Sequence, residues 1–112
     1  AGAAATPPLP VPPTQFYGVY DGHTGKLAAE YVRTHLHVQV VRDAAYRTDV
    51  RRAVHNAFLR TDRMFNRHAD RDTLKDGTTV VTLVARDAQL HVHWCGDSEA
   101  LLGTAGGGGR GA

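Results

Sequence analysis

The sequence has few of the features that mark a secreted or membrane-embedded protein. Its 112 residues contain one cysteine, Cys95, so no internal disulfide can form, and a single thiol suits a reducing compartment. No apolar run approaches the roughly 20 residues that a membrane-spanning helix needs, and no basic and apolar segments of a signal peptide open the chain. We therefore expect a cytoplasmic or nuclear location and no membrane partner.

Charge of one sign is not concentrated anywhere in the chain. Lys and Arg number 13 against 11 Asp and Glu, which gives a net charge of +2, and the arginines are interspersed with aspartates. Blocks of like charge, which are typical of interaction tails, are missing. The sequence therefore predicts no nucleic-acid partner.

The two ends differ in composition from the rest of the chain. Residues 1–14 are rich in alanine and proline, and residues 103–112 are rich in glycine. Both compositions favour extended or irregular chain over packed structure. We predict a linker over 1–14, a single partial domain over 15–102 and a tail over 103–112.

The pattern of apolar residues between these ends predicts an α+β domain. Residues 78–85 are the strongest strand signal, and their apolar residues occur at both parities, which predicts that both faces of this strand are covered. Asp49 stands where a carboxylate can cap the second helix. The expected elements are a buried strand over 15–20, helices over 26–41 and 49–69, strands over 78–85 and 90–95, and an additional strand over 99–102.

Two aspartates stand beside glycines where predicted strands end. The pentad Asp21-Gly22-His23-Thr24-Gly25 follows the first strand, and Gly96-Asp97-Ser98 follows the strand over 90–95. Carboxylate and carbonyl oxygens are the ligands that Mg²⁺ and Mn²⁺ select. An isolated Asp-Gly is also an ordinary turn, so the residues alone leave both interpretations open.

Three blocks, Phe16 to Gly25, Asp76 to Val80 and Val92 to Leu102, together resemble the metal-dependent protein phosphatases of the PPM, or type-2C, family. They occur in the family's order and spacing and span nearly all of 15–102. Residues 90–94 are most similar to the branch directed at calmodulin-dependent kinases. The resemblance implies part of a β-sandwich of antiparallel sheets flanked by helix pairs.

The resemblance also implies a reaction, the dephosphorylation of phosphoserine and phosphothreonine in protein substrates by metal-activated water. Asp21 would bridge two Mg²⁺ or Mn²⁺ ions and Gly22 would bind one of them through its carbonyl oxygen. His23 would be the general acid, and Asp97 would serve an additional, weaker metal site. An imidazole is a suitable proton donor near neutral pH.

The chain also departs from the family pattern. Thr24 replaces a usual glycine, and residues 1–13 carry no charged side chain, so the upstream arginine and acidic ligands are missing. The ligand set is incomplete, and we expect an N-terminal portion of a longer catalytic domain, with strands such as 78–85 left unpaired. The alternative is a truncated, catalytically inactive interaction module.

Other chemistries have weaker support in the sequence. Ser98 lies in a Gly-Asp-Ser esterase-like triplet, but no histidine follows it. His91, His93 and Cys95 share one strand face, as zinc ligands can. The simpler interpretation is that they are partly buried strand residues, and we expect Cys95 to be buried. Arginines also form a row on the second helix, which is either a solvated face or a docking stripe for an acidic or phosphorylated partner; these are Arg52, Arg60, Arg63, Arg67 and Arg71.

Overall fold

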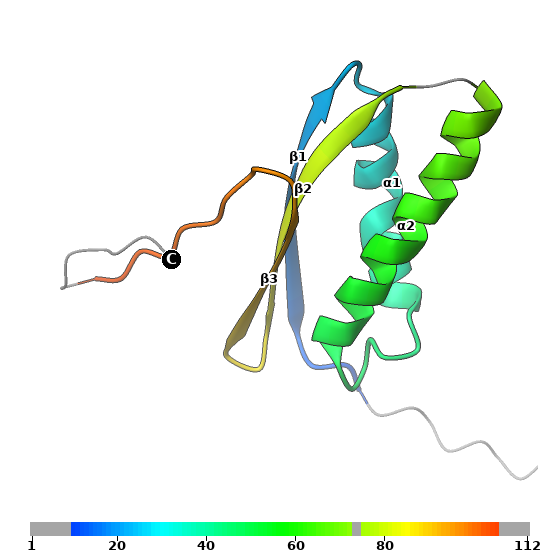
Figure 1. Cartoon of the computed structure of the whole chain (residues 1–112). Helices are drawn as coiled ribbons and strands as arrows, with labels where there is room; N and C mark the ends of the chain where they lie inside the picture. Colours follow the sequence, from blue (N-terminus) through cyan, green and yellow to red (C-terminus); the bar gives the residue numbers. More distant parts are fainter. Residues whose placement is uncertain (1–9, 73–74, 106–112) are drawn as a thin grey trace, which may run out of the picture.

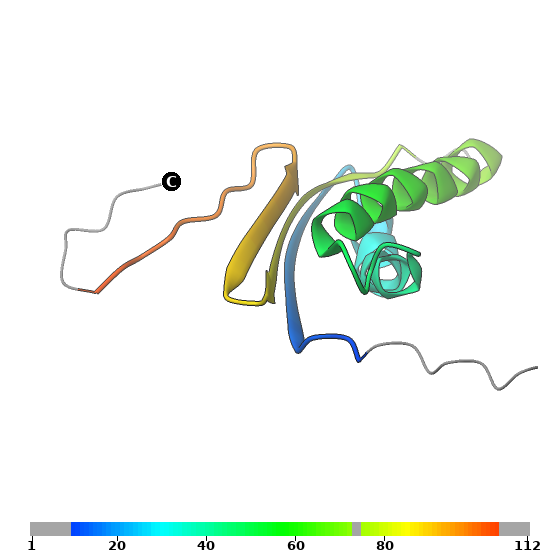
Figure 2. The same cartoon turned by 90° about the horizontal axis from the view of Figure 1, so that it is seen from below.

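The computed structural model describes residues 10–72 and 75–105, which form two layers (Figure 1 and Figure 2). A three-stranded antiparallel sheet carries two helices on one of its faces. The elements in chain order are β1 (Thr14–His23), α1 (Leu27–Arg42), α2 (Val50–Asp72), β2 (Gly77–Arg86) and β3 (Gln89–Cys95). The predicted α+β class is confirmed.

β2 is the central strand of the sheet. The strand order is β1-β2-β3, and Val80, for example, lies opposite Tyr20 on one side and Cys95 on the other. The expectation that residues 78–85 would lack partners is therefore wrong. The additional strand predicted over 99–102 is also wrong, because these residues form neither helix nor strand.

β1 is longer than the sequence predicted and carries the first three residues of the pentad. Asp21, Gly22 and His23 stay extended because they pair with Thr79, Thr78 and Gly77 of β2. The chain turns only afterwards, at Thr24 and Gly25, which have φ angles of 59° and 129°. The turn interpretation of Asp21-Gly22 is therefore wrong. So is the buried strand, because β1 lies at an edge of the sheet, with Tyr17 57% and Val19 63% exposed.

The core lies between the helices and the covered face of the sheet. Leu36 of α1, Val54 of α2 and Val84 of β2 are each at most 1% exposed, and burying such a side chain contributes about 1.5–3 kcal/mol. The predicted cap of α2 is confirmed, because the Asp49 carboxylate accepts a hydrogen bond from the Arg52 backbone amide at 3.1 Å. The amphipathic pattern thus fixes which face of α2 meets the sheet, whereas α1, apolar on several sides, buries Ala28, Val32, Leu36 and Val40 at every fourth position.

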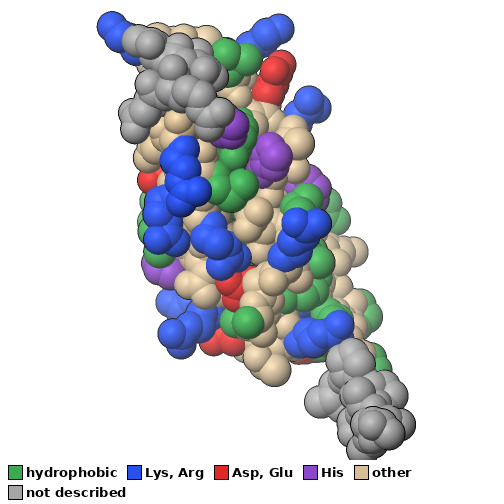
Figure 3. Space-filling model, turned by 90° about the vertical axis from the view of Figure 1, so that its right-hand side faces the viewer, with side chains coloured by type: hydrophobic (Ala, Val, Ile, Leu, Met, Phe, Trp, Pro, Cys, Tyr) green, Lys and Arg blue, Asp and Glu red, His purple; other side chains and the backbone are tan. Residues whose placement is uncertain are grey.

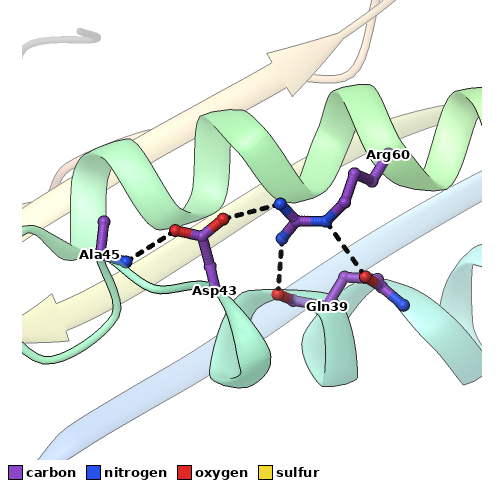
Figure 4. A network of polar contacts seen from close by, with 4 residues as sticks. All are labelled: Gln39, Asp43, Ala45 and Arg60. Atoms are coloured by element: carbon purple, nitrogen blue, oxygen red, sulfur yellow. Dashed lines mark hydrogen bonds and ion pairs between the residues drawn. The ribbon is translucent and has the colours of Figure 1, made fainter.

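A polar network joins the two helices at the end where they are connected (Figure 4). The Arg60 guanidinium donates to the Asp43 carboxylate at 2.8 Å and to the carbonyl and side-chain oxygens of Gln39 at 3.0 and 3.2 Å. The Ala45 amide also donates to Asp43, and this bond and Arg60 hold the pKa of Asp43 below its usual value. Arg60 therefore belongs to the interface between the helices, and its assignment to the solvated row was wrong.

The opposite face of the sheet is open and apolar in the part of the chain described. Both helices lie on the face that carries Val80 and Val84 (Figure 2). On the other face Val81 is 8% exposed between its strand neighbours Val19 and Trp94, but no described element packs over it, so the prediction that β2 is covered on both faces is wrong here. Successive residues of a strand point to opposite faces of the sheet, so the open face carries the alternate residues of each strand. Five large apolar side chains on this face are 39–65% exposed: Tyr17, Val19, Leu90, Val92 and Trp94. An apolar patch of this kind marks a contact surface.

Candidate metal site at the end of the sheet

Asp21 and His23 lie on the open face near the end of β1. Alternate residues of a strand share a face and are about 7 Å apart, and the partners of these two across β2 are Thr79 and Gly77. The His23 imidazole covers Gly77, because a Cβ added to Gly77 would collide with it. Asp21 and His23 are both exposed, so a carboxylate and an imidazole face solvent side by side.

Gly22 lies between them, where a side chain has little room. A Cβ at this position would be 3.1 Å from the Gly25 carbonyl oxygen and 3.2 Å from the Ala29 Cβ. Glycine is therefore favoured here by packing against the start of α1, independently of any ligand. The role of its carbonyl oxygen as a metal ligand stays a prediction.

The Gly96-Asp97-Ser98 turn packs against β2 at the same end of the sheet. The Ser98 and Thr79 hydroxyls are hydrogen-bonded at 2.7 Å. Gly96 has φ of 97°, and a Cβ there would approach the Thr79 methyl group at 2.7 Å. Because Thr79 also pairs with Asp21, the pentad and the Gly96-Asp97-Ser98 turn lie on opposite sides of Thr79. Adjacent strands are about 4.8 Å apart, so β1 and β3 are separated by about 10 Å.

Asp76 holds the loop between β1 and α1, a role that the sequence interpretation missed. Its carboxylate accepts a hydrogen bond from the Leu27 amide at 3.0 Å, which supplies the cap that Lys26 does not provide to α1. Gly25 lies so close to this carboxylate that a Cβ would collide with it. The available signal was the start of α1, which has no Ser, Thr, Asp or Asn at its cap position.

We expect Asp76→Ala to lower the free energy of unfolding by about 1 kcal/mol, because the first amide of α1 loses its partner. Asp76→Asn keeps an acceptor oxygen and should lose less. Urea denaturation followed by circular dichroism measures both, and amide hydrogen exchange at Leu27 should accelerate in Asp76→Ala. Asp62→Ala, an exposed change on α2, is the control, and an equal loss there would contradict the capping role.

Proteins of one family match this chain over most of its length. The family model "Protein phosphatase 2C" matches residues 6–110. The chain belongs to the protein phosphatase 2C family. "Protein phosphatase 1F" from Homo sapiens is 44% identical over 87 residues, which are 78% of this chain and 19% of that protein. "Probable protein phosphatase 2C 27" from Oryza sativa subsp. japonica is 39% identical over 92 residues, 81% of this chain and 26% of that protein.

The chain thus spans about a quarter or less of the relatives it matches. For "Protein phosphatase 1E" from Mus musculus, 42% identical over 87 residues, the share is 12% of that protein. The blocks that carry the resemblance lie within the matched region. Membership of the phosphatase 2C family is shown, and assignment to its calmodulin-kinase-directed branch stays a prediction.

The donors at the end of the sheet have the oxygen chemistry that Mg²⁺ or Mn²⁺ selects. Mg²⁺ usually keeps several waters and takes one or two carboxylates, which an exposed Asp21 with the neighbouring Gly22 carbonyl can supply. Asp97 follows a strand about 10 Å away, so it suits a separate ion. Among the residues that the structure describes, no three His, Cys, Asp or Glu side chains are grouped to hold a metal.

The alternative chemistries gain no support within the described ranges. The Ser98 hydroxyl is engaged with Thr79, and the esterase interpretation is not favoured. Cys95 is exposed, so its prediction as a buried strand cysteine is wrong. His91, His93 and Cys95 do share the strand parity of the covered face, but they are not grouped as metal ligands in this part of the chain. No described helix is long and apolar enough to span a membrane.

His93 is partly buried on the covered face of the sheet. It lies near Phe58, with ring centroids 6.0 Å apart, and its Nδ1 atom is buried without a hydrogen-bond partner in the described structure. Burial first, and then the charges of His91, Arg51 and His55, lower its pKa below the usual 6.5. The folded state therefore favours the neutral imidazole.

We expect stability to fall as the pH drops below about 6.5, because the unfolded chain then binds a proton that folded His93 resists. The contribution of His93 to the free energy of unfolding is complete above that pH. It is lost as the pH falls toward the lower pKa that His93 has in the folded state. His93→Gln should flatten the pH dependence of the urea midpoint between pH 7 and pH 5, a range above the titration of Asp43. An unchanged slope, or equal flattening in the exposed control His37→Gln, would refute this.

Proposed function

We propose that this chain forms part of the catalytic centre of a protein serine/threonine phosphatase. The observation that carries the proposal is the register of the sheet, which brings Asp21, His23 and the turn of Asp97 to one end around Thr79. The family relationship supports a phosphorylated protein as substrate. A cytoplasmic or nuclear location belongs to the same proposal.

Asp21 and the Gly22 carbonyl would hold Mg²⁺ or Mn²⁺, and Asp97 would serve a further ion. When bound, such ions stabilise negative charge on phosphoryl oxygens and lower the pKa of water. The remaining ligands and the phosphate-binding arginine would come from parts of a phosphatase outside this chain. The open apolar face of the sheet is where a second sheet would pack, which agrees with the sandwich that the resemblance implies.

His23 would act as the general acid. Hydrolysis forms a bond from phosphorus to a water oxygen and breaks the bond from phosphorus to the serine or threonine oxygen. The departing oxygen then takes a proton from the His23 imidazole, which is exposed beside Asp21. Gly77 leaves room for the ring, because any side chain there would displace it.

A chimera tests the proposal in a complete protein. The matching 87 residues of human protein phosphatase 1F are replaced by those of this chain, and phosphate release from a phosphoserine peptide is measured with Mn²⁺ and with EDTA. We expect Mn²⁺-dependent turnover that EDTA abolishes. A folded but inactive chimera beside an active parent would instead favour the inactive interaction module.

A further inference from the structure

The outer face of α2 carries a row of three arginines. Arg52, Arg63 and Arg67 are exposed, and at 100° per residue they fall within an arc of about 60°. Among the side chains that the structure describes, which do not include those of residues 70–72, these three form no ion pair, whereas Arg60 is paired with Asp43. Figure 3 shows Lys and Arg side chains gathered over this side of the molecule. The Arg71 side chain lies outside the described residues.

The spacing of this arginine row (Arg52, Arg63 and Arg67) works against the stability of an isolated helix. Arg63 and Arg67 are four residues apart, and like charges at this spacing destabilise a helix. Asn56 and Leu59, which lie on the same face, are uncharged. Between Arg52 and Arg67 this face therefore carries only positive charge, and a negatively charged partner would relieve the repulsion.

Leu59 adds an apolar contact point within the row. Its side chain is 51% exposed, and it also lines a groove between α2 and the sheet with a volume of about 710 Å³, together with Phe58 and Phe65. Leu59 is the one strongly exposed large apolar residue described on α2. Since it offers no aromatic platform for stacking bases, the surface fits a peptide better than a nucleic acid.

We propose that the arginine row and Leu59 form a docking surface for an acidic peptide segment of a partner protein. The row spans 15 residue steps, about 22 Å of helix, which about seven residues of extended peptide would cover. Acidic side chains of the peptide face the arginines, and one apolar side chain packs on Leu59. This surface is separate from the end of the sheet and acts without catalysis.

Fluorescence anisotropy with the 112-residue chain tests this docking surface. The probes are a labelled ten-residue glutamate peptide with a central leucine and its glutamine counterpart, at low salt because screening weakens exposed charges. We expect the glutamate peptide to bind and the glutamine peptide not to bind. Arg63→Glu/Arg67→Glu should weaken binding about tenfold, and Leu59→Gln should weaken it more than Leu27→Gln, an exposed change on α1.

The single change Arg63→Glu is compared with a matched control, Arg33→Glu, which alters an exposed arginine on α1. Equal weakening by both would mean that net charge alone attracts the peptide, which would overturn the proposal. Tighter binding of single-stranded RNA, lost in the same α2 variants, would overturn it in favour of nucleic acid. Circular dichroism verifies folding, and Arg63→Gln/Arg67→Gln replaces the charge reversal if that variant unfolds.

Discussion

Asp21→Asn in the phosphatase 1F chimera is expected to lower Mn²⁺-dependent phosphate release about a hundredfold. The substitution keeps the size of the side chain but removes the negative charge that attracts a divalent cation. Asp21 is exposed on an edge strand, so folding should be unaffected. Raising the Mn²⁺ concentration should recover part of the activity.

The control for this change is Asp87→Asn. Asp87 is exposed in the turn between β2 and β3, at the far end of the sheet, with φ of 53°, a conformation that asparagine tolerates. The same chemical change there should leave activity within about twofold. If Asp21→Asn and Asp87→Asn behave alike, Asp21 has no part in the chemistry.

The same assay separates the role of His23 from that of Asp21. A general acid contributes about a hundredfold or more when the leaving oxygen needs a proton. His23→Ala should therefore slow hydrolysis of phosphoserine strongly and of an aryl phosphate, whose phenolate leaves readily, much less. Asp21→Asn should slow both. Equal losses on the two substrates in His23→Ala would contradict the proton-donor role.

Leu36→Ala is expected to lower the free energy of unfolding of the 112-residue chain by about 3 kcal/mol. Leu36 is 1% exposed at the centre of the layer between α1 and the sheet, so truncation removes apolar contacts and leaves a cavity. A loss of this size is a large fraction of the about 5–15 kcal/mol that stabilises a typical protein. The midpoint of urea denaturation measures it.

Val41→Ala on the same helix is the matched control. Val41 is 57% exposed, and its truncation should change stability by about 0.5 kcal/mol or less. A similar cost for both variants would mean that α1 does not pack on the sheet as the structure shows.

The helices and the central strand could be predicted because their signals are local. The apolar periodicity of residues 26–41 and 49–69 places α1 and α2 within three residues of their observed ends, and the run over 78–85 lies within β2. The ends of β1 could not be predicted in this way. Asp21 to His23 are extended only because β2, more than 50 residues later, supplies their backbone partners.

The candidate site also combines features that the sequence predicts with features that depend on the fold. Asp21, His23 and Asp97 are recognisable by residue type and by the family resemblance, but their meeting around Thr79 is a result of strand register. Asp76 was missed because its partner, the Leu27 amide, is 49 residues away. Arg60 and Cys95 were misplaced because helical or strand parity alone does not show which neighbour covers a side chain.

Residue types at short range and ordered motifs were sufficient to predict the α+β class, the amphipathic face of α2 and membership of the type-2C phosphatases. The central position of β2, the open face of the sheet and the capping of α1 by Asp76 became apparent only from the folded arrangement. These features depend on contacts between distant segments, whose free energies come from packing and pairing that local patterns do not encode.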